Sequence, residues 1–515
     1  MTGNAPTEDR LGLNVRLRYA SILNYVLNIG GIFFGFLFIT LVARRLTVEE
    51  YGVWVMILRY VSYLIIPGAI YSYWLPRNIS RGQNTSRTGL YTSIVFGFIL
   101  VPFYFLMVQT VSRELDQPIF PLALSSIILL LEYINTSLGP ISSGHAPQIT
   151  GYGTLVLKIG QAVSAYLLIG FWSLGLAGAV IAAVIGRVCL NVVSLMMNRH
   201  ILRGSRFDPS VLRSWLRASW LPIFAAITLF IPTFDVVVVR IFFGSEVPVA
   251  YYGIATGLLS IALVTAVVST SLYPKILAKR NLEDLREGIW LILLLSLPVL
   301  YLILLYAEPL SALFGVKYLP VAWPLRVLAV ASLLQLLSGL AGIAYFGLEG
   351  ADEEALSSKI LLRSAIFKSN LVNFIIGLLY LASLAALSFL ALTATSYVEL
   401  WGVASIISYA LSFVILTMLI KRDFGQTFPF RTIARDFVTF TVPAIPMCIP
   451  FLLFRVQVAE IFYQMVLNLI PPALASLLLY FATLYAIEGK FRSTVRDAVR
   501  RLLFINNKQR NGIGT

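Results

Sequence analysis

Long apolar runs separated by short polar segments recur along the whole chain. Counting them gives about fourteen stretches of roughly 19–26 residues, each long enough as a helix to cross a hydrocarbon core of ~30 Å. The pattern therefore predicts an all-α polytopic membrane protein. The spans are expected at 20–43, 52–75, 89–110, 118–139, 153–173, 175–197, 218–241, 249–274, 288–306, 319–346, 367–391, 398–420, 436–455 and 463–486.

The composition supports this prediction and excludes a soluble class. Of the 515 residues, 58% are hydrophobic and 12% are charged, against roughly 25% charged residues in soluble domains. The net charge of +15 resembles that of a nucleic-acid-binding protein. In a membrane chain, however, such an excess reflects the enrichment of basic residues on the cytoplasmic side. We therefore expect no nucleic-acid partner.

The distribution of basic residues predicts the orientation in the plasma membrane. With the N-terminus inside, 29 lysines and arginines lie on the cytoplasmic side and six on the other side. Such an asymmetry sets topology, so both termini are expected in the cytoplasm. Residues 491–504 form an apolar and basic pattern with helical spacing, which is typical of a helix lying among lipid headgroups.

A weak internal repeat suggests two lobes in the same orientation. Tyr51-Gly52 and Tyr252-Gly253 begin corresponding spans, and Pro76-Arg77 and Pro274-Lys275 follow at similar intervals. Because proline disrupts a helix, both prolines are expected at bends at the inner ends of spans two and eight. The predicted parts are an N-lobe at 1–205, a C-lobe at 206–425, a helix pair at 426–488 and a cytoplasmic amphipathic tail at 489–515.

Two segments give the chain a resemblance to a known family. The stretch 38–52, which includes Arg44-Arg45-Leu46-Thr47 and Glu50-Tyr51-Gly52, and the stretch 172–178 resemble polysaccharide and lipid-linked oligosaccharide flippases. These flippases belong to the multidrug/oligosaccharidyl-lipid/polysaccharide (MOP) exporter superfamily. The resemblance implies a V-shaped transporter with two six-helix lobes, a terminal helix pair and a central cavity lined by spans one, two, seven and eight.

Charged residues inside the spans are the first candidates for function, because each costs roughly 2.5–3.5 kcal/mol on insertion scales. Lys158 and Arg326 lie near helix ends, where their side chains are expected to reach the headgroups. Glu132 and Arg187 have similar depths, which makes a structural ion pair one interpretation. The six residues are Arg59, Glu132, Lys158, Arg187, Asp235 and Arg326.

Arg59 is the strongest candidate for substrate binding. Its span lines the cavity according to the resemblance, and a guanidinium is well suited to phosphate. Arg187 is a second basic candidate, and Asn24 and Asn28 are the polar residues of span one. An Arg59 paired with Asp235 purely for structure is the alternative.

Asp235 on span seven supports two functional hypotheses, beside the alternative of a static structural acid. In the first, it pairs with Arg59 as an outer gate that opens when the lobes separate. In the second, it binds Na⁺ or H⁺ and couples an ion gradient to transport. The resemblance implies a sodium site among spans seven, eleven and twelve, but Asn370 and Asn373 begin span eleven at the opposite membrane face.

Other classes of protein fit the sequence less well. A polytopic glycosyltransferase needs a large outer loop with acidic metal ligands, and the predicted outer loops are short. The sequence contains no phosphate-binding loop motif and no catalytic triad pattern, so no enzyme activity, catalytic residue, metal site or cofactor is expected. A multidrug or cation exporter of the same superfamily remains the alternative, although such a cavity should be dominated by acids.

The sequence thus predicts a flippase that moves a lipid-linked oligosaccharide, on a polyprenyl- or dolichyl-phosphate carrier, to the outer leaflet. Transport would proceed by alternating access between the two lobes. The expected partners are the lipid-linked glycan and membrane lipids, with a monomer as the functional form.

Overall fold

The computed structural model describes residues 8–266, 272, 276–277, 280–283, 285–349, 364–497 and 500. The chain forms two compact units. Unit 1 contains residues 1–253 and 373–394, and unit 2 contains residues 254–372 and 395–515. The boundaries between the units fall inside helices α12 and α18 and at the start of α19, whose bounds follow. Pro274, Lys275, the acidic segment 352–354 and residues 501–515 lie outside the described residues.

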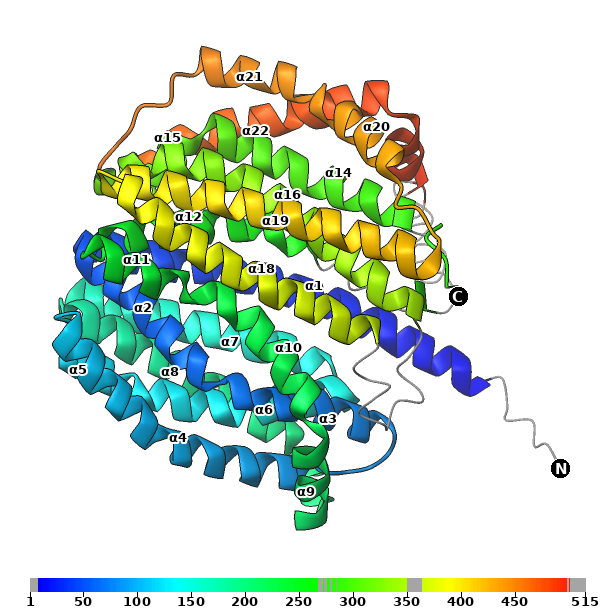
Figure 1. Cartoon of the computed structure of the whole chain (residues 1–515). Coiled ribbons are helices and arrows are strands. Elements are labelled where there is room, and N and C mark those ends of the chain that lie inside the picture. Colours follow the sequence, from blue (N-terminus) through cyan, green and yellow to red (C-terminus); the bar gives the residue numbers. More distant parts are fainter. Residues whose placement is uncertain are drawn as a thin grey trace, which may run out of the picture. The chain divides into compact units, whose positions relative to one another are not determined.

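Unit 1 is built almost entirely from helices (Figure 1). Helix α1 packs against α7, α7 against α8, α8 against α6, and α6 against α3 and α4. Helices α10 and α11 complete the unit, together with the greater part of α18. The bounds are α1 (Glu8–Arg45), α2 (Val48–Leu64), η1 (Ile66–Gly68), α3 (Ala69–Ser80), α4 (Ser86–Glu114), α5 (Ile119–Leu124), α6 (Ser126–His145), α7 (Gln148–Ala165), η2 (Tyr166–Phe171), α8 (Gly175–Arg203), α9 (Pro209–Ala218), α10 (Trp220–Phe230), η3 (Ile231–Phe234), α11 (Asp235–Phe243), α12 (Val247–Leu263) and α18 (Ala365–Leu387).

Unit 2 is a second helical bundle with its own apolar core. Helix α14 packs against α16, α20, α21 and α22. Hydroxyl contacts fasten the last helices to this bundle: Tyr301 and Thr441 are 2.6 Å apart, and Tyr306 and Ser476 are 2.9 Å apart. The bounds are η4 (Val264–Ala266), α14 (Leu285–Leu305), α15 (Ala307–Ala312), η5 (Val316–Val321), α16 (Ala322–Glu349), η7 (Ser388–Leu390, in unit 1), α19 (Ala394–Phe424), α20 (Phe430–Thr441), α21 (Ala444–Leu453) and α22 (Phe462–Ile487).

The predicted membrane spans are confirmed. The described residues contain 13 helices long and apolar enough to cross a membrane, or 14 if the bent pair Val48–Leu64 and Ile66–Ser80 is one span. Large apolar side chains such as Phe98, Leu229 and Ile445 are exposed along these helices. Such exposure is unfavourable in water but favourable against lipid tails, so the protein is an all-α polytopic membrane protein.

The bend in span two differs from the prediction. Helix α3 continues through Pro76 to Ser80, whereas the chain bends by 50° between α2 and the segment that starts at Ile66. Pro67 lies in the first turn of that segment, where its missing N–H leaves no hydrogen bond unmade. The bend is therefore set by Ile66-Pro67-Gly68, and Pro76 is accommodated within a helix.

The compact units group the helices differently from the predicted lobes. Unit 1 contains the predicted N-lobe and also α10, α11 and residues 373–394, while unit 2 includes the terminal helices α20 to α22. A compact unit is defined by packing and a repeat by ancestry, so the predicted lobes stay a prediction. Residues 489–497 of the predicted amphipathic tail are helical, and Phe491 stacks on Phe481 of α22 at 6.1 Å.

Candidate functional site

The segment that carries the family resemblance starts α2 with a capping box. Thr47 Oγ1 accepts a hydrogen bond from the Glu50 backbone N–H at 3.1 Å, and Glu50 Oε2 accepts one from the Thr47 N–H at 2.9 Å. The two side chains thus satisfy backbone donors that a helix start leaves without partners. The motif fixes where α2 begins and so positions Tyr51, Gly52 and Arg59 along it.

The two Tyr-Gly pairs of the internal repeat pack against one another. A Cβ atom added to Gly52 of α2 would overlap the backbone carbonyl of Glu246, just before α12. A Cβ added to Gly253 of α12 would lie 2.6 Å from Val55 and 3.5 Å from Tyr51. Each glycine therefore permits the close approach of the other helix. The repeat marks a crossing of α2 and α12 within unit 1.

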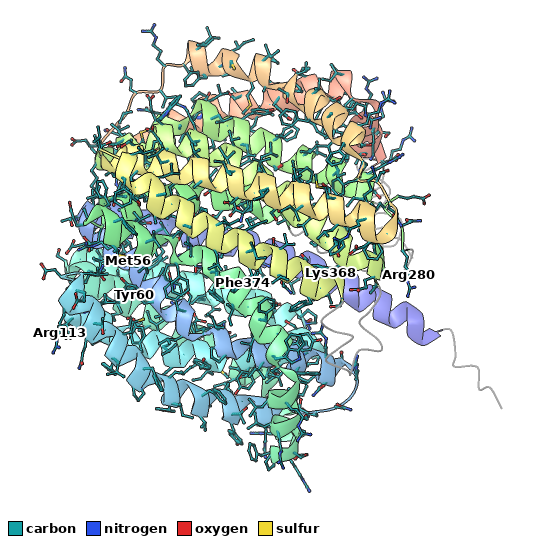
Figure 2. The ribbon with its side chains drawn as sticks, viewed as in Figure 1. Met56, Tyr60, Arg113, Arg280, Lys368 and Phe374 are labelled. Atoms are coloured by element: carbon teal, nitrogen blue, oxygen red, sulfur yellow. The ribbon has the colours of Figure 1, made fainter. Side chains whose placement is uncertain are left out.

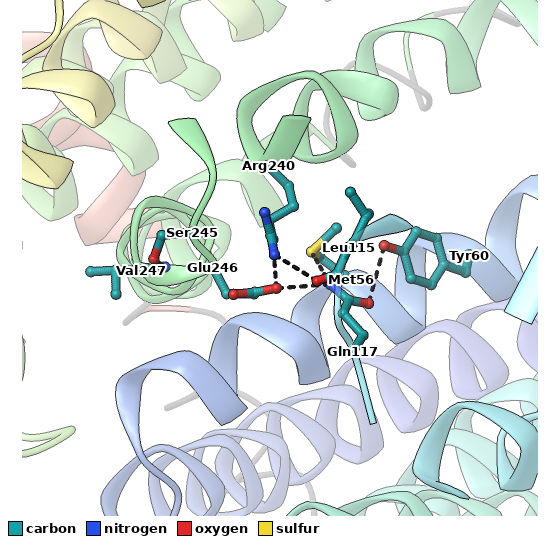
Figure 3. A network of polar contacts seen from close by, with 8 residues as sticks. All are labelled: Met56, Tyr60, Leu115, Gln117, Arg240, Ser245, Glu246 and Val247. Atoms are coloured by element: carbon teal, nitrogen blue, oxygen red, sulfur yellow. Dashed lines mark hydrogen bonds and ion pairs between the residues drawn. The ribbon is translucent and has the colours of Figure 1, made fainter. Parts of the chain in front are cut away.

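A polar network, shown in Figure 3, surrounds this crossing at the end of unit 1 predicted to face outside. Arg240 Nε of α11 lies 2.6 Å from Glu246 Oε1, and Arg240 Nη2 donates to the Leu115 carbonyl at 2.6 Å. Gln117 Nε2 donates to the same Glu246 oxygen at 3.2 Å. These contacts connect the α11–α12 connection with the α4–α5 connection.

Gln117 extends the network into α2. Tyr60 Oη donates to Gln117 Oε1 at 3.4 Å, and Gln117 Nε2 lies 3.2 Å from Met56 Sδ. Tyr60 and Met56 are buried on α2 (Figure 2). The sequence pattern does not reveal this network, because Arg240 and Glu246 resemble ordinary outer-loop charges and a neutral glutamine carries no charge signal. Their spacing of six residues across a Gly-Ser turn was the available clue.

Asp235 is buried at the start of α11, with 3% of its surface exposed. Its Oδ2 accepts a hydrogen bond from Tyr380 Oη of α18 at 3.0 Å, and its Oδ1 accepts one from the Val236 N–H at 2.8 Å. Asn370 and Asn373 lie earlier on α18 than Tyr380. Nothing in the sequence distinguishes Tyr380, because the chain contains 25 tyrosines.

Arg59 lies half-buried on α2, one turn before Tyr63. The Tyr63 ring stacks on Phe234 with centroids 4.1 Å apart, and its hydroxyl donates to the Thr233 carbonyl at 2.6 Å. Tyr63 lies within electrostatic range of both Arg59 and Asp235. The ion pairs formed by described residues do not include Arg59 with Asp235, so the predicted gate pairing stays a prediction.

Glu132 of α6 and Arg187 of α8 lie in contact inside unit 1. Arg187 Nε is 2.6 Å from Glu132 Oε1, with 14% and 23% of the side chains exposed. Arg187 Nη1 also donates to the Ala183 carbonyl at 3.2 Å, and Asn191 Nδ2 donates to the Leu131 carbonyl at 2.9 Å. The Arg187 charge is thus balanced by an acid on the neighbouring helix.

Lys158 of α7 lies close to this pair. Its methylene groups cover Gly31 and Gly35 of α1, and its ammonium is within electrostatic range of both Arg187 and Glu132. It forms no ion pair with a carboxylate in the described part of the chain. The three side chains form a group with two positive charges and one negative charge.

The remaining candidates are placed as follows. Asn24 lies within α1, and its side chain is outside the described residues, while Asn28 is exposed on the same helix. Arg326 lies 3.6 Å from Glu308 and near the Trp323 ring. No group of three or more His, Cys, Asp or Glu side chains suited to a metal ion occurs among the described residues.

The fold is that of transporters of the MOP superfamily. A multidrug resistance MATE family transporter in an inward-facing conformation matches with a TM-score of 0.61 at 14% identity, over 76% of this chain and 95% of that protein. The lipid II flippase MurJ, in an inward closed conformation, matches with a TM-score of 0.61 at 13% identity, over 91% of this chain and 99% of that protein. A MOP superfamily transporter from Pyrococcus furiosus, described with a reverse polarity of its binding pocket, matches with a TM-score of 0.52 at 15% identity, over 79% of this chain and 95% of that protein.

No protein family matches the sequence, and a search of curated proteins finds no match. These structural neighbours are described as transporters or as a lipid flippase. At these identities the likeness establishes the fold, and the substrate has to be argued from the residues.

Proposed function

We propose that the protein is a flippase that moves a lipid-linked oligosaccharide from the cytoplasmic to the outer leaflet. The glycan would be carried on a polyprenyl or dolichyl phosphate or diphosphate. Its anionic headgroup would enter between the lobes while the hydrocarbon tail stays in lipid, and alternating access would expose it to the other side. The expected topology has both termini in the cytoplasm, and the expected form is a monomer.

The observation that carries the proposal is an excess of positive charge inside the spans of unit 1. Arg59 and Lys158 form no ion pair with a carboxylate in the described part of the chain, whereas Arg187 is paired with Glu132. A charge at membrane depth without a counter-charge is costly, and such charges occur mainly where a ligand or a pathway uses them. A phosphate or diphosphate would supply the missing negative charge.

The neutral residues near Arg59 support a role in recognition. Tyr63 lies one turn further along α2 and is held by its stacking on Phe234. An aromatic ring held in this way favours contact with the apolar faces of a sugar or the first isoprene units. Arg59 and Arg187 are the proposed phosphate ligands, and Asn24 and Asn28 are the proposed polar contacts on span one.

The direct test is to identify the lipid that the protein retains and to measure its movement. Purified protein should carry a polyprenyl-phosphate-linked glycan detectable by mass spectrometry after solvent extraction. In proteoliposomes, it should expose a fluorescent polyprenyl-diphosphate disaccharide to an external quencher faster than protein-free vesicles do. Retention of phospholipids alone, together with no acceleration, would contradict the proposal.

A multidrug or cation exporter is the second candidate, and one observation favours it. Asp235 is an acid buried at membrane depth, and its carboxylate accepts a hydrogen bond from the neutral Tyr380 hydroxyl at 3.0 Å. A cation exporter should move ethidium out of loaded proteoliposomes, whereas the proposed flippase should not. The two assays on one preparation separate the candidates.

A further inference from the structure

Helix α9 lies across the end of the unit 1 helices that is predicted to face the cytoplasm (Figure 1). It connects the span Gly175–Arg203 to the span Pro222–Phe243, so both of its ends are held close to the membrane surface. Trp215 anchors it: the indole is buried and meets the Tyr71 ring edge to face at 6.4 Å. The following Ser219 Oγ accepts a hydrogen bond from Trp74 Nε1 at 3.2 Å.

The opposite face of α9 is basic with an apolar margin. Arg213 and Arg217 lie one turn apart and are both exposed, and Leu216 beside them is 48% exposed. Before the helix, Phe207 is 49% exposed and lies 6.3 Å from the ring of Tyr91 on α4. Basic residues flanked by exposed leucine and aromatic rings are typical of helices lying in the headgroup region.

The positive charge of this region is not neutralised within the described residues. Five arginines lie between positions 199 and 217, all of them are exposed, and none forms an ion pair with a described carboxylate: Arg199, Arg203, Arg206, Arg213 and Arg217. Asp208 is the one acid of the segment.

Asp208 is committed to the start of α9. Its Oδ1 accepts hydrogen bonds from the Ser210 N–H at 2.8 Å and the Ser210 hydroxyl at 2.6 Å. These bonds lower the pKa of the Asp208 carboxyl, which therefore stays ionised as a helix cap. A capping carboxylate is directed at the helix backbone and leaves the arginines available to an external anion.

We propose that α9 and the five arginines before and within it form a binding surface for the headgroups of anionic phospholipids. The guanidiniums would contact the phosphates, while Leu216 and Phe207 would lie against the first acyl carbons. A bilayer is the occupant that the structure favours, because the two flanking spans hold α9 at the membrane surface and apolar side chains border the charge. This surface is distinct from the proposed substrate residues Arg59 and Arg187.

The test measures binding of phosphatidylglycerol and phosphatidylcholine to the full-length protein by native mass spectrometry. The variant Arg213→Gln/Arg217→Gln is compared with Arg113→Gln/Arg455→Gln, which removes the same charge from exposed positions at connections predicted to face outside. Arg113 is labelled at the far end of α4 (Figure 2). Each arginine near an anionic surface contributes about fivefold, so the first variant should bind phosphatidylglycerol about 25-fold more weakly.

The control variant should match the wild type, and phosphatidylcholine binding should be equal in all three proteins. Equal phosphatidylglycerol affinity of the Arg213/Arg217 variant and the wild type would overturn the proposal. So would displacement of phosphatidylglycerol by glycerol 3-phosphate, because the surface would then bind free phosphates. If the variant does not fold, the wild-type protein provides the test. Raising the ionic strength should weaken its binding of phosphatidylglycerol but not of phosphatidylcholine, and an absence of that effect would refute the proposed lipid surface.

Discussion

Arg240 and Glu246 form an ion pair of 2.6 Å that closes the connection between α11 and α12, with only 12% and 13% of the side chains exposed. Gln117 and the Leu115 carbonyl complete their hydrogen bonds. The pair therefore fastens the α11–α12 connection to α2 and to the α4–α5 connection. A contact of this kind must be retained or broken whenever those helices move relative to one another.

Replacing one member of this pair should destabilise the folded protein more than replacing both members. Arg240→Met leaves the Glu246 carboxylate buried without its cation, and breaking a buried pair costs about 3–5 kcal/mol. We expect a marked fall in the thermal unfolding temperature of the purified protein. Arg240→Met/Glu246→Gln should recover most of it, and Arg113→Met on the exposed end of α4 should change nothing. A double variant as unstable as the single one would show that the charge pair is not the stabilising element.

Gly52→Ala should destabilise the protein because the new Cβ atom would overlap the Glu246 carbonyl. Overpacking of this kind costs about 1–3 kcal/mol, since a backbone carbonyl cannot move aside without shifting α12. Gly257→Ala is the matched control in α12, because nothing lies within contact distance of its added Cβ. There, alanine should be neutral or stabilising in the same thermal unfolding measurement. Equal behaviour of the two variants would argue against a close crossing at Gly52.

Variants of the Glu132–Arg187 pair can distinguish a structural role of Arg187 from a role in binding substrate. Glu132→Gln should lower the folded yield, because it leaves Arg187 as an unpaired cation at membrane depth. Glu132→Gln/Arg187→Met removes both charges and should restore folding, as measured by size-exclusion chromatography. The flipping activity of the folded double variant then shows which role the pair has. Full activity would assign the pair to structure alone, whereas loss of activity would place Arg187 among the substrate ligands.

Arg59→Ala should weaken substrate binding without unfolding the protein. A hydrogen bond to a charged group contributes about 1.5–3 kcal/mol, which predicts a loss of apparent affinity of roughly 10- to 100-fold. Arg59→Lys should retain part of it, because lysine keeps the charge but not the planar pair of donors. The measurement is the concentration dependence of flipping in proteoliposomes. Wild-type behaviour of a correctly folded Arg59→Ala variant would remove Arg59 from the binding site.

The gate hypothesis for Asp235 is tested by proximity in more than one state. The two cysteines of the chain, Cys189 and Cys448, are first replaced by serine. The cysteines of an Arg59→Cys/Asp235→Cys variant should then be joined by a short bifunctional reagent, and substrate should change the yield of that cross-link. If no state gives a cross-link and Asp235→Asn abolishes a dependence of transport on Na⁺ or pH, ion coupling replaces the gate.

The spans could be read from the sequence because the bilayer leaves the backbone few choices. A run of about 20 apolar residues at membrane depth must satisfy its own hydrogen bonds, and a helix does so locally. The predicted stretch 175–197 is thus found as Gly175–Arg203, and 463–486 as Phe462–Ile487. The Thr47 to Glu50 capping box is likewise local, since its partners are three residues apart.

The partners of the polar side chains were decided by tertiary structure. Tyr380 meets Asp235 across 145 positions of sequence, and Gln117 meets Glu246 across 129. Tyrosine and glutamine are neutral, so neither the distribution of charges nor a helical period distinguishes the side chains that bond from those that do not. The bend at Pro67 rather than Pro76 has the same origin, because whether a proline bends a helix depends on the packing around it. Sequence alone determined which segments enter the membrane, through the local energetics of burial, whereas contacts between distant helices determined which residues form a site.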